Sequence, residues 1–553
     1  MAFKPVRFTR SLFILLSFFA LSSLADSPAA SPVIPPDALC DSTRYPALCK
    51  TVLRSQNGTV FDFGRVLLRR SLSQSQIFLN QVDSYLQSSS SLSQPTIGAL
   101  KDCSFLAGLN IEFLSDALNA VQNLNDFLSS SQAQDLETLF SAVLTNQQTC
   151  QDGLQTTASD GRVKDDLSSS LSNDSKLHSV SLALFTKGWV PQKNTTTSWP
   201  NNRRLLDFLQ SRIFDSTSRS HDRKLLQSVN GSVVVTGSVV VSQDGSGNFT
   251  TINDAINAAP NNTASGAGYF LIFITSGVYQ EYVSIPKYKQ YLMIVGDGIN
   301  RTIITGDHNV VDGYTTFNSA TFAVVAQGFV AVNITFRNTA GAIKHQAVAM
   351  RSGADLSVFY LCSFEGYQDT LYTHSMRQFY RECDIYGTVD FIFGNAAVVM
   401  QNCNLYPRLP LSGQFNTITA QGRTDPGQNT GTSIQNATIK AADDLAPSVG
   451  TVQTYLGRPW KEYSRTVFME SWIDSLINPA GWHDWNGTFA LSTLYYAEYN
   501  NSGPGSNTSN RVTWPGYHVI NATDAVNFTV ANFLIGDAWL PPTGVPHYSG
   551  FAS

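Results

Sequence analysis

The chain has 553 residues, of which 42% are hydrophobic and 14% are charged, and its formal net charge is −5 at pH 7. A single core does not normally extend over this length, so we expect at least two domains, and the composition is typical of folded proteins. The net negative charge argues against a nucleic-acid partner, which would favour a basic surface.

The N-terminus has the pattern of a secretory leader. Basic residues within the first ten precede an apolar run over residues 12–21, and Ser23-Leu24-Ala25 supplies the small residues of a cleavage site. A retained membrane anchor is the alternative, but the run is short for a spanning helix. We therefore expect a signal peptide over residues 1–25 and a secreted, extracellular protein.

Secretion would also expose the chain to N-glycosylation, and N-x-Ser/Thr sequons recur along it. Any single sequon is weak evidence, because the pattern is common by chance. The candidate glycosylation sites are Asn57, Asn230, Asn436, Asn486 and Asn521.

The cysteines fall into two groups, four before residue 200 and three after residue 360. An oxidising compartment favours disulfides, and an odd total leaves at least one thiol unpaired. We expect two disulfides in the first group, Cys40–Cys49 and Cys103–Cys150. In the second group we favour Cys383–Cys403 with Cys362 free. The alternative is that these three cysteines are small buried residues stacked in a core.

Residues 36–190 have the periodicity of helices. Apolar residues recur at three- and four-residue spacing in the stretches 64–72 and 111–118, and Ser-rich breaks such as 88–91 separate them. This pattern predicts an antiparallel helical bundle. The region has no acid pair and no pattern of metal ligands, so we expect it to act by binding.

A polar linker is expected over residues 191–227. It contains the same four-residue pattern twice, Arg203-Arg204-Leu-Leu and Arg223-Lys224-Leu-Leu. Exposed basic pairs between domains are typical sites of proteolysis. We therefore expect a processing protease to cut at one of these pairs, and the alternative is an ordinary charged linker.

Residues 237–540 lose the helical periodicity and become rich in short β-type segments. The stretches 270–274, 291–295 and 322–325 are apolar and β-branched, and Gly, Asn and Asp turns separate such stretches. Long helices do not alternate with them, which argues against a doubly wound or TIM-barrel sheet. A β-sandwich also fits these short strand-like segments.

An interval of about 21 residues favours a different architecture. Asp369 and Asp390 are 21 residues apart, Gln346 and Gln368 are 22 apart, and the last three cysteines step by 21 and 20. A repeat of this length predicts stacked coils, and we expect a right-handed parallel β-helix. Residues one coil apart then lie roughly 5 Å apart, which would gather two acids and two amides at one point.

Such a group of side chains suits ester hydrolysis, which needs a nucleophile, a proton donor for the leaving alkoxide and donors for the oxyanion. The chain has no GxSxG elbow and no convincing Cys–His pair. Two carboxylates can perform the reaction if their surroundings hold one charged and the other neutral. Taken singly, each Asp could equally be a turn former and each Gln a rung of a structural ladder.

Five stretches, in order, resemble the plant pectin methylesterase family. They are 277–281 (GVYQE), 346–351 (QAVAMR), 366–372 (GYQDTLY), 389–394 (VDFIFG) and 455–460 (YLGRPW). The helical region resembles the pectin methylesterase inhibitor fold, through its cysteines and the stretch 145–154 (TNQQTCQDGL). The resemblance implies a pro-enzyme with a signal peptide, an inhibitor-like pro-domain over 36–190, a processing linker and a catalytic β-helix over 237–540.

The resemblance also implies a role for each catalytic residue. Asp390 would be the nucleophile, and Asp369 would first donate a proton to methanol and then act as the base. Gln346 and Gln368 would donate to the oxyanion. Arg458 would keep Asp390 ionised and oriented and would also contact the substrate.

Two further residues, Thr316 and Trp460, would line the substrate groove, since an aromatic face stacks well on a sugar ring. Trp460 could instead cap the solenoid. His345 and His374 lie close to these motifs, but the resemblance gives neither a catalytic role, and we expect them to support the site by hydrogen bonding.

The implied reaction converts methylated homogalacturonan (pectin) and water into pectate and methanol, in the plant cell wall or apoplast. We expect a monomer that uses no cofactor and no metal, and an inhibitor protein with the fold of its own pro-domain is an expected partner. A lyase or polygalacturonase of the same fold would cleave the sugar backbone instead. A third reading, a non-catalytic inhibitor or binding module, applies to the first domain in isolation.

Overall fold

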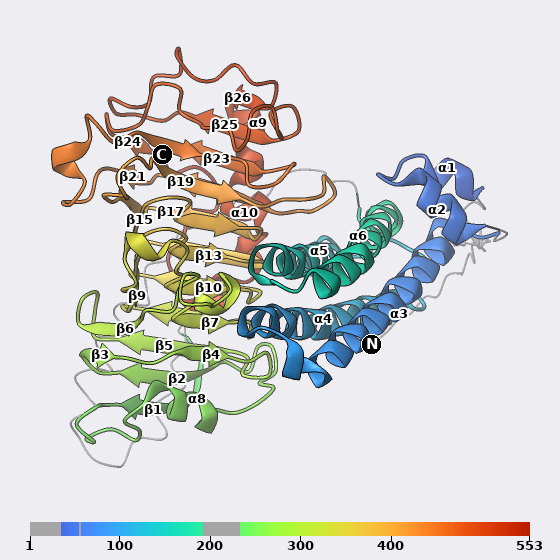
Figure 1. Cartoon of the computed structure of the whole chain (residues 1–553), viewed down its shortest axis with the longest axis horizontal. Helices are drawn as coiled ribbons and strands as arrows, with labels where there is room; N and C mark the ends of the chain where they lie inside the picture. The colour runs from blue at the N-terminus through green and yellow to red at the C-terminus, as the bar shows by residue number, and fades with distance from the viewer. Residues whose placement is uncertain (1–34, 55–56, 192–232, 553) are drawn as a thin grey trace, which may run out of the picture.

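The structure is a computed structural model that describes residues 35–54, 57–191 and 233–552. It has a helical domain followed by a parallel β-helix, which confirms the predicted fold classes (Figure 1). No helix within the described ranges is both long and apolar enough to cross a bilayer. The predicted leader, both basic pairs and Asn230 lie outside the described residues.

The helical domain is built from four long helices that follow a short helical hairpin. The hairpin consists of α1 (Pro36–Cys40) and α2 (Pro46–Leu53), and the long helices are α3 (Val60–Gln87), α4 (Gln94–Val121), α5 (Ser130–Thr157) and α6 (Gly161–Trp189). Each long helix begins at a side chain that accepts a hydrogen bond from the first turn, namely Thr59, Ser93, Ser129 and Asp160. Such caps satisfy backbone N–H groups that the helix itself leaves unpaired.

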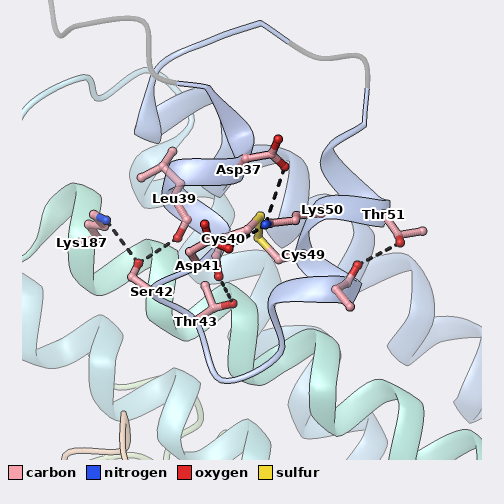
Figure 2. Close-up of a disulfide and its surroundings, with 11 residues drawn as sticks. Asp37, Leu39, Cys40, Asp41, Ser42, Thr43, Cys49, Lys50, Thr51 and Lys187 are labelled. Carbon is pink, nitrogen blue, oxygen red and sulfur yellow. Dashed lines mark hydrogen bonds and ion pairs between the residues drawn. A yellow bond between two sulfur atoms is a disulfide. The ribbon is translucent and has the colours of Figure 1, made fainter.

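Both disulfides predicted for this domain are present. Cys40–Cys49 closes the α1–α2 hairpin, where Lys50 also forms an ion pair with Asp41 at 2.6 Å (Figure 2). Cys103–Cys150 joins the middle of α4 to α5 across 47 residues. The second bond connects two of the helices that contact the β-helix.

Three parallel sheets form the β-helix, and their strands follow one another coil by coil. The first sheet contains β1 (Val235–Val241), β2 (Tyr269–Ile274), β5 (Leu292–Gly296), β8 (Val330–Val332), β11 (Ser357–Tyr360), β14 (Arg377–Arg381), β17 (Ala397–Gln401), β20 (Gly431–Gln435), β23 (Arg465–Met469), β25 (Tyr495–Tyr499) and β26 (Tyr517–Val519). The second contains β3 (Gly277–Tyr279), β6 (Thr302–Gly306), β9 (Thr335–Asn338), β12 (Ser363–Glu365), β15 (Asp384–Gly387), β18 (Asn404–Pro407), β21 (Thr438–Ile439) and β24 (Trp472–Ile473).

The third sheet faces the helical domain and carries the candidate site. Its strands are β4 (Val283–Ile285), β7 (Phe322–Val324), β10 (Met350–Ser352), β13 (Leu371–Thr373), β16 (Ile392–Gly394), β19 (Asn416–Gln421) and β22 (Thr454–Gly457). Short helix α8 (Ile252–Ala258) lies near the first coil, and α9 (Ala522–Ala525) follows the last strand, β26. The chain then returns along the first sheet, where α10 (Val530–Phe533) packs against β17.

Stacked apolar side chains fill the interior of the β-helix. Phe336 stacks on Phe364 with ring centroids 5.5 Å apart, and Phe359 stacks on Tyr380 at 4.7 Å. Because parallel strands in register place equivalent residues above one another, a coil that repeats its apolar residues builds a continuous core.

The predicted Cys383–Cys403 disulfide is wrong, because Cys362, Cys383 and Cys403 are all buried free thiols. They come directly before β12, β15 and β18, which pair in register. Equivalent Cβ atoms on stacked coils point the same way, whereas a disulfide needs its two side chains to turn towards each other. Each thiol instead donates to a backbone carbonyl, as Cys383 Sγ does to Phe359 O at 3.4 Å.

Candidate active site

Asp369 and Asp390 hold equivalent positions on successive coils, as their spacing predicts. Each lies two residues before a strand of the third sheet, and the first residues of those strands, Leu371 and Ile392, are paired partners. Both acids have left-handed backbone, with φ of 62° and 53°. Asp adopts this region more readily than most residues, so these two corners suit an acidic side chain.

The Asp390 carboxylate is buried, with 5% of the residue exposed, and it is bound on both oxygens. Arg458 donates from Nε to Oδ1 at 2.8 Å and from Nη2 to Oδ2 at 2.6 Å. Thr417 lies on β19, in the next coil, and its hydroxyl donates to Oδ1 at 2.6 Å. A two-point contact with Arg fixes the orientation of the carboxylate as well as supplying the opposite charge.

Asp369 lies in a different electrostatic environment. Burial raises the pKa of its carboxyl well above the usual value, the charge of Asp390 raises it further, and the charge of Arg458 lowers it. Arg458 forms its hydrogen bonds with Asp390 and not with Asp369. The arrangement therefore has one carboxylate bound to Arg458 and one carboxyl group that favours the protonated form.

The two glutamines lie beside these acids and line the same pocket. The backbone N–H of Ala347 donates to the Gln368 carbonyl at 3.2 Å, so Gln346 sits one residue away from the coil equivalent of Gln368. Neither side-chain amide has a hydrogen-bond partner among the described residues. Both are therefore available as donors to a bound group.

A pocket of about 270 Å³ surrounds these side chains. The predicted site residues Thr316 and Trp460 are in its wall. The wall also contains four aromatic residues for which the sequence predicted no role, Phe317, Tyr372, Phe393 and Trp485. The Trp485 ring covers the Arg458 guanidinium, with 4.3 Å between Cζ and the ring centroid. The pocket thus has a polar floor and apolar sides, as sugar-binding sites commonly do.

Two of the missed residues differ in how visible they are in the sequence. Thr417 follows Asp390 by 27 residues and pairs with it as the next coil, so a search that allowed longer coils could have found it. Trp485 lies outside the named strands and breaks the repeat, so spacing gives no signal for it.

The histidines near the motifs do not reach the reacting groups. His374 is buried, and burial holds its pKa well below the usual value. Its Nε2 is 2.9 Å from the Thr149 hydroxyl of the helical domain. His345 is exposed and is not part of the pocket wall. Among the candidate glycosylation sites within the described ranges, Asn57, Asn436, Asn486 and Asn521 are all exposed.

The helical domain covers this pocket. Residues of α4 and α5 complete its wall, namely Asp102, Thr149, Asp152, Gly153 and Thr156, and Figure 1 shows the ends of these helices against β7, β10 and β13. Lys461, next to Trp460, donates to Asp152 Oδ1 at 2.7 Å. Apolar side chains of both domains share one buried cluster, which includes Cys103 and Leu106 as well as Phe317 and Tyr372.

Further polar contacts join the two domains around the pocket. Asn395 donates to Thr145 at 2.9 Å, and Gln428 donates to the Ser141 carbonyl at 2.9 Å. On one side Arg377 donates to Asp135 at 2.7 Å, and on the other Arg44 donates to Glu462 at 2.6 Å. The helical domain is therefore attached on several sides of the pocket.

Two family models match the chain, one over the β-helix and one over the helical domain. The family model described as Pectinesterase matches residues 238–537, and the model described as Plant invertase/pectin methylesterase inhibitor matches residues 36–184. The chain is similar to "Probable pectinesterase/pectinesterase inhibitor 7" of Arabidopsis thaliana, with 56% identity over 98% of this chain and 99% of the relative. It is also similar to "Probable pectinesterase/pectinesterase inhibitor 41" of the same plant, with 58% identity over 93% of this chain and 94% of the relative.

Among solved structures, the pectin methylesterase from carrot is 55% identical, with a TM-score of 0.56. The match covers 59% of this chain and all of the carrot chain. Since the pectinesterase model spans more than half of the sequence and the relatives match over nearly their whole length, this chain belongs to the pectinesterase family and carries a pectin methylesterase inhibitor domain ahead of its β-helix.

Proposed function

We propose that the β-helix hydrolyses the methyl esters of homogalacturonan, with Asp390 as the nucleophile. The observation that carries this proposal is the unequal pair of acids. Asp390 is bound on both oxygens by Arg458, and burial raises the pKa of the neighbouring Asp369 well above its usual value. Membership of the pectinesterase family supplies the substrate class.

In the first step an oxygen of the Asp390 carboxylate attacks the ester carbonyl carbon and forms a tetrahedral intermediate. The amides of Gln346 and Gln368 donate to its oxyanion. As the bond to the methoxy oxygen breaks, Asp369 transfers its proton to that oxygen, and methanol leaves. The galacturonate acyl group is then joined to Asp390 as an anhydride.

In the second step a water molecule attacks the acyl carbon of the anhydride. Asp369, now a carboxylate, takes a proton from that water, which regenerates its neutral form. The bond to Asp390 breaks, and Asp390 returns to the anionic form that Arg458 binds. The products are a free galacturonate carboxylate and methanol, and the sugar backbone stays intact.

The test compares methanol release by the β-helix alone with that of its Asp390→Asn variant. All of the solved carrot chain is matched by 59% of this chain, which supports using the β-helix without the helical domain. We expect the variant to lose at least about a thousandfold in kcat, as nucleophile replacements commonly do. The matched control is Glu365→Gln, which removes a carboxylate from an arginine pair outside the pocket.

Circular dichroism would check that both variants fold. Undiminished methanol release by Asp390→Asn would reject the nucleophile assignment. Shortening of the pectin chain without methanol release would favour a lyase or polygalacturonase instead.

We further propose that the helical domain inhibits the β-helix in the intact chain. Five of its residues are part of the pocket wall, and Lys461, beside Trp460, is bound to Asp152. A polymer therefore has no free path to Asp390 while the domains are joined. An inhibitor protein of the same fold would bind the free β-helix at the same surface.

A charge reversal in the intact chain tests this inhibition. Asp152→Lys places two ammonium groups side by side, so we expect methanol release to rise about tenfold towards that of the β-helix alone, since like charges in an interface cost several kcal/mol. Asp166→Lys, on α6, reverses an exposed charge outside the contact and serves as the control. Full activity of the unmodified intact chain would contradict the proposal.

Secretion to the cell wall and cleavage in the linker complete the proposed pathway. The leader pattern over residues 1–25 and the basic pairs at Arg203-Arg204 and Arg223-Lys224 motivate both steps. Mass spectrometry of the secreted protein would identify the new N-terminus. A start before residue 191 in the active form would contradict processing in the linker.

A further inference from the structure

A buried carboxylate of the helical domain occupies a polar recess of the β-helix. The carboxylate belongs to Asp102 on α4, which is 4% exposed. Its Oδ2 accepts a hydrogen bond from the Thr315 hydroxyl, and its Oδ1 accepts one from the Asn318 amide. Both of these donors belong to the β-helix, whereas the acceptor belongs to the helical domain.

The recess also contains a buried cation, Arg351, which is 5% exposed. The Arg351 guanidinium lies 3.5 Å from the centroid of the Phe317 ring, and its Nε donates to the Phe317 carbonyl at 3.0 Å. Its Nη1 is buried and has no hydrogen-bond partner among the described residues. Arg351 therefore keeps unused donor capacity and a charge that attracts the Asp102 carboxylate.

The recess lies between the catalytic pocket and a second hollow. Thr315 and Phe317 line the catalytic pocket, whereas Asn318 and Arg351 line a neighbouring pocket of about 280 Å³. The second pocket also contains a stack of three rings, Tyr282, His308 and Tyr314, with centroids 3.5 and 3.7 Å apart. A sugar chain that leaves the catalytic pocket on this side would meet the recess first and the ring stack next.

We propose that Thr315, Asn318 and Arg351 form a subsite for the free carboxylate of an already de-esterified galacturonate unit, and that Asp102 fills this subsite in the intact chain. Separation of the domains leaves Thr315 and Asn318 without the acceptor that they bind in the intact chain, and removes the carboxyl group nearest to the Arg351 charge. This inference rests on the proposed function, which supplies a substrate with one carboxyl group on each sugar.

The subsite distinguishes the product group from the substrate group. A free uronate offers a full negative charge and two acceptor oxygens, and Asp102 presents two oxygens in the same way to Thr315 and Asn318. A methyl ester has no charge and adds a methyl group where Arg351 and Asn318 would meet it. The enzyme should therefore favour chains that carry a free carboxylate at a fixed position relative to the ester being cleaved.

The test uses unmethylated trigalacturonate as an inhibitor of methanol release from highly methylated pectin by the β-helix. Asn318→Asp is nearly isosteric and replaces the amide donor with a repelling charge. We expect the inhibition constant to rise at least about tenfold relative to the KM for highly methylated pectin, as loss of a hydrogen bond to a charged group commonly does. Asn257→Leu, an exposed site on α8, should leave this ratio unchanged.

A second measurement tests the role of Asp102 by direct titration. The intact chain, whose subsite is filled, should bind trigalacturonate at least about tenfold more weakly than the β-helix, as expected when a hydrogen-bonded carboxyl group already occupies the site. Equal inhibition of the parent and of Asn318→Asp, or equal binding by the intact chain, would overturn the proposal. If the unmodified β-helix released no methanol at all, the proposed function would fail instead.

Discussion

Arg458 binds Asp390 through two parallel hydrogen bonds, from Nε to Oδ1 at 2.8 Å and from Nη2 to Oδ2 at 2.6 Å. The two residues are 68 positions apart in the chain and meet because β16, β19 and β22 stack in register. The pair orients the proposed nucleophile without involving the second acid.

Arg458→Lys should reduce kcat by at least about a hundredfold, because an ammonium group cannot reproduce the two-point contact and leaves one carboxylate oxygen free to turn. The measurement is methanol release by the isolated β-helix over a range of pectin concentrations. Arg337→Lys alters the Arg337–Glu365 pair and is the matched control. A kcat within twofold of the parent would show that charge alone suffices.

Asp369→Asn should stabilise the intact chain, in which the helical domain covers the pocket around Asp369, increasingly as the pH rises. Burial raises the pKa of Asp369 in the folded state, so its contribution to stability is fully present below the ordinary carboxyl pKa and is lost as the pH rises through the raised value. An amide does not ionise and avoids this loss. Between about pH 4 and pH 9 the melting temperature of the variant relative to the parent should increase by at least about 2 °C.

The measurement is a series of thermal melts of both proteins, with Asp443→Asn, an exposed acid, as the control. The same substitution in the isolated β-helix should leave almost no methanol release, because the amide cannot donate the proton that the leaving group needs. A melting difference that does not change with pH would contradict the assignment of Asp369 as the neutral acid.

The intact chain should become more active, relative to the isolated β-helix, as the pH rises towards neutrality. Burial raises the pKa of Asp102 to about 7, and the opposing contributions of Thr315, Arg351 and Asn318 are smaller. Because the pKa of Asp102 is raised when the helical domain is bound, binding of that domain to the β-helix is strongest below the ordinary carboxyl pKa. The binding weakens as the pH rises through about 7.

Asp102→Asn should flatten this pH dependence, because the amide stays neutral. The measurement is the ratio of methanol release by the intact chain to that by the β-helix between about pH 4 and pH 8, the range in which the linked protonation changes. Asp116→Asn, an exposed acid on the same helix, is the control. An unchanged slope in Asp102→Asn would assign the pH dependence to another group.

The three cysteines of the β-helix should react with iodoacetamide only after unfolding. Cys362, Cys383 and Cys403 are buried and unpaired, so denaturation without reductant should give a chain with three labels. Mass spectrometry of the labelled peptides counts them directly. Detection of peptides joined by a Cys383–Cys403 disulfide would contradict this prediction.

The sequence carried enough information to bring the two acids together. The 21 residues between Asp369 and Asp390 form one coil of the β-helix. Parallel strands in register then place the two acids one strand spacing apart. The same argument placed the three cysteines in one stack, but stacking also points their side chains in the same direction, which is why the inferred disulfide was wrong. The spacing of Gln346 and Gln368 was nearly but not fully regular, and the structure shows the offset of one residue.

The tertiary structure alone decided what surrounds those acids. Arg458 and Trp460 could be named only by likeness to a family, and Trp485, which lies outside the repeat, could be placed over Arg458 only in the folded structure. The contact of Asp102 with Thr315 joins residues 213 positions apart in two different domains. Periodicity is a local property that a sequence displays directly, but the fit of one domain against another depends on the shape and charge of surfaces that exist only after both have folded.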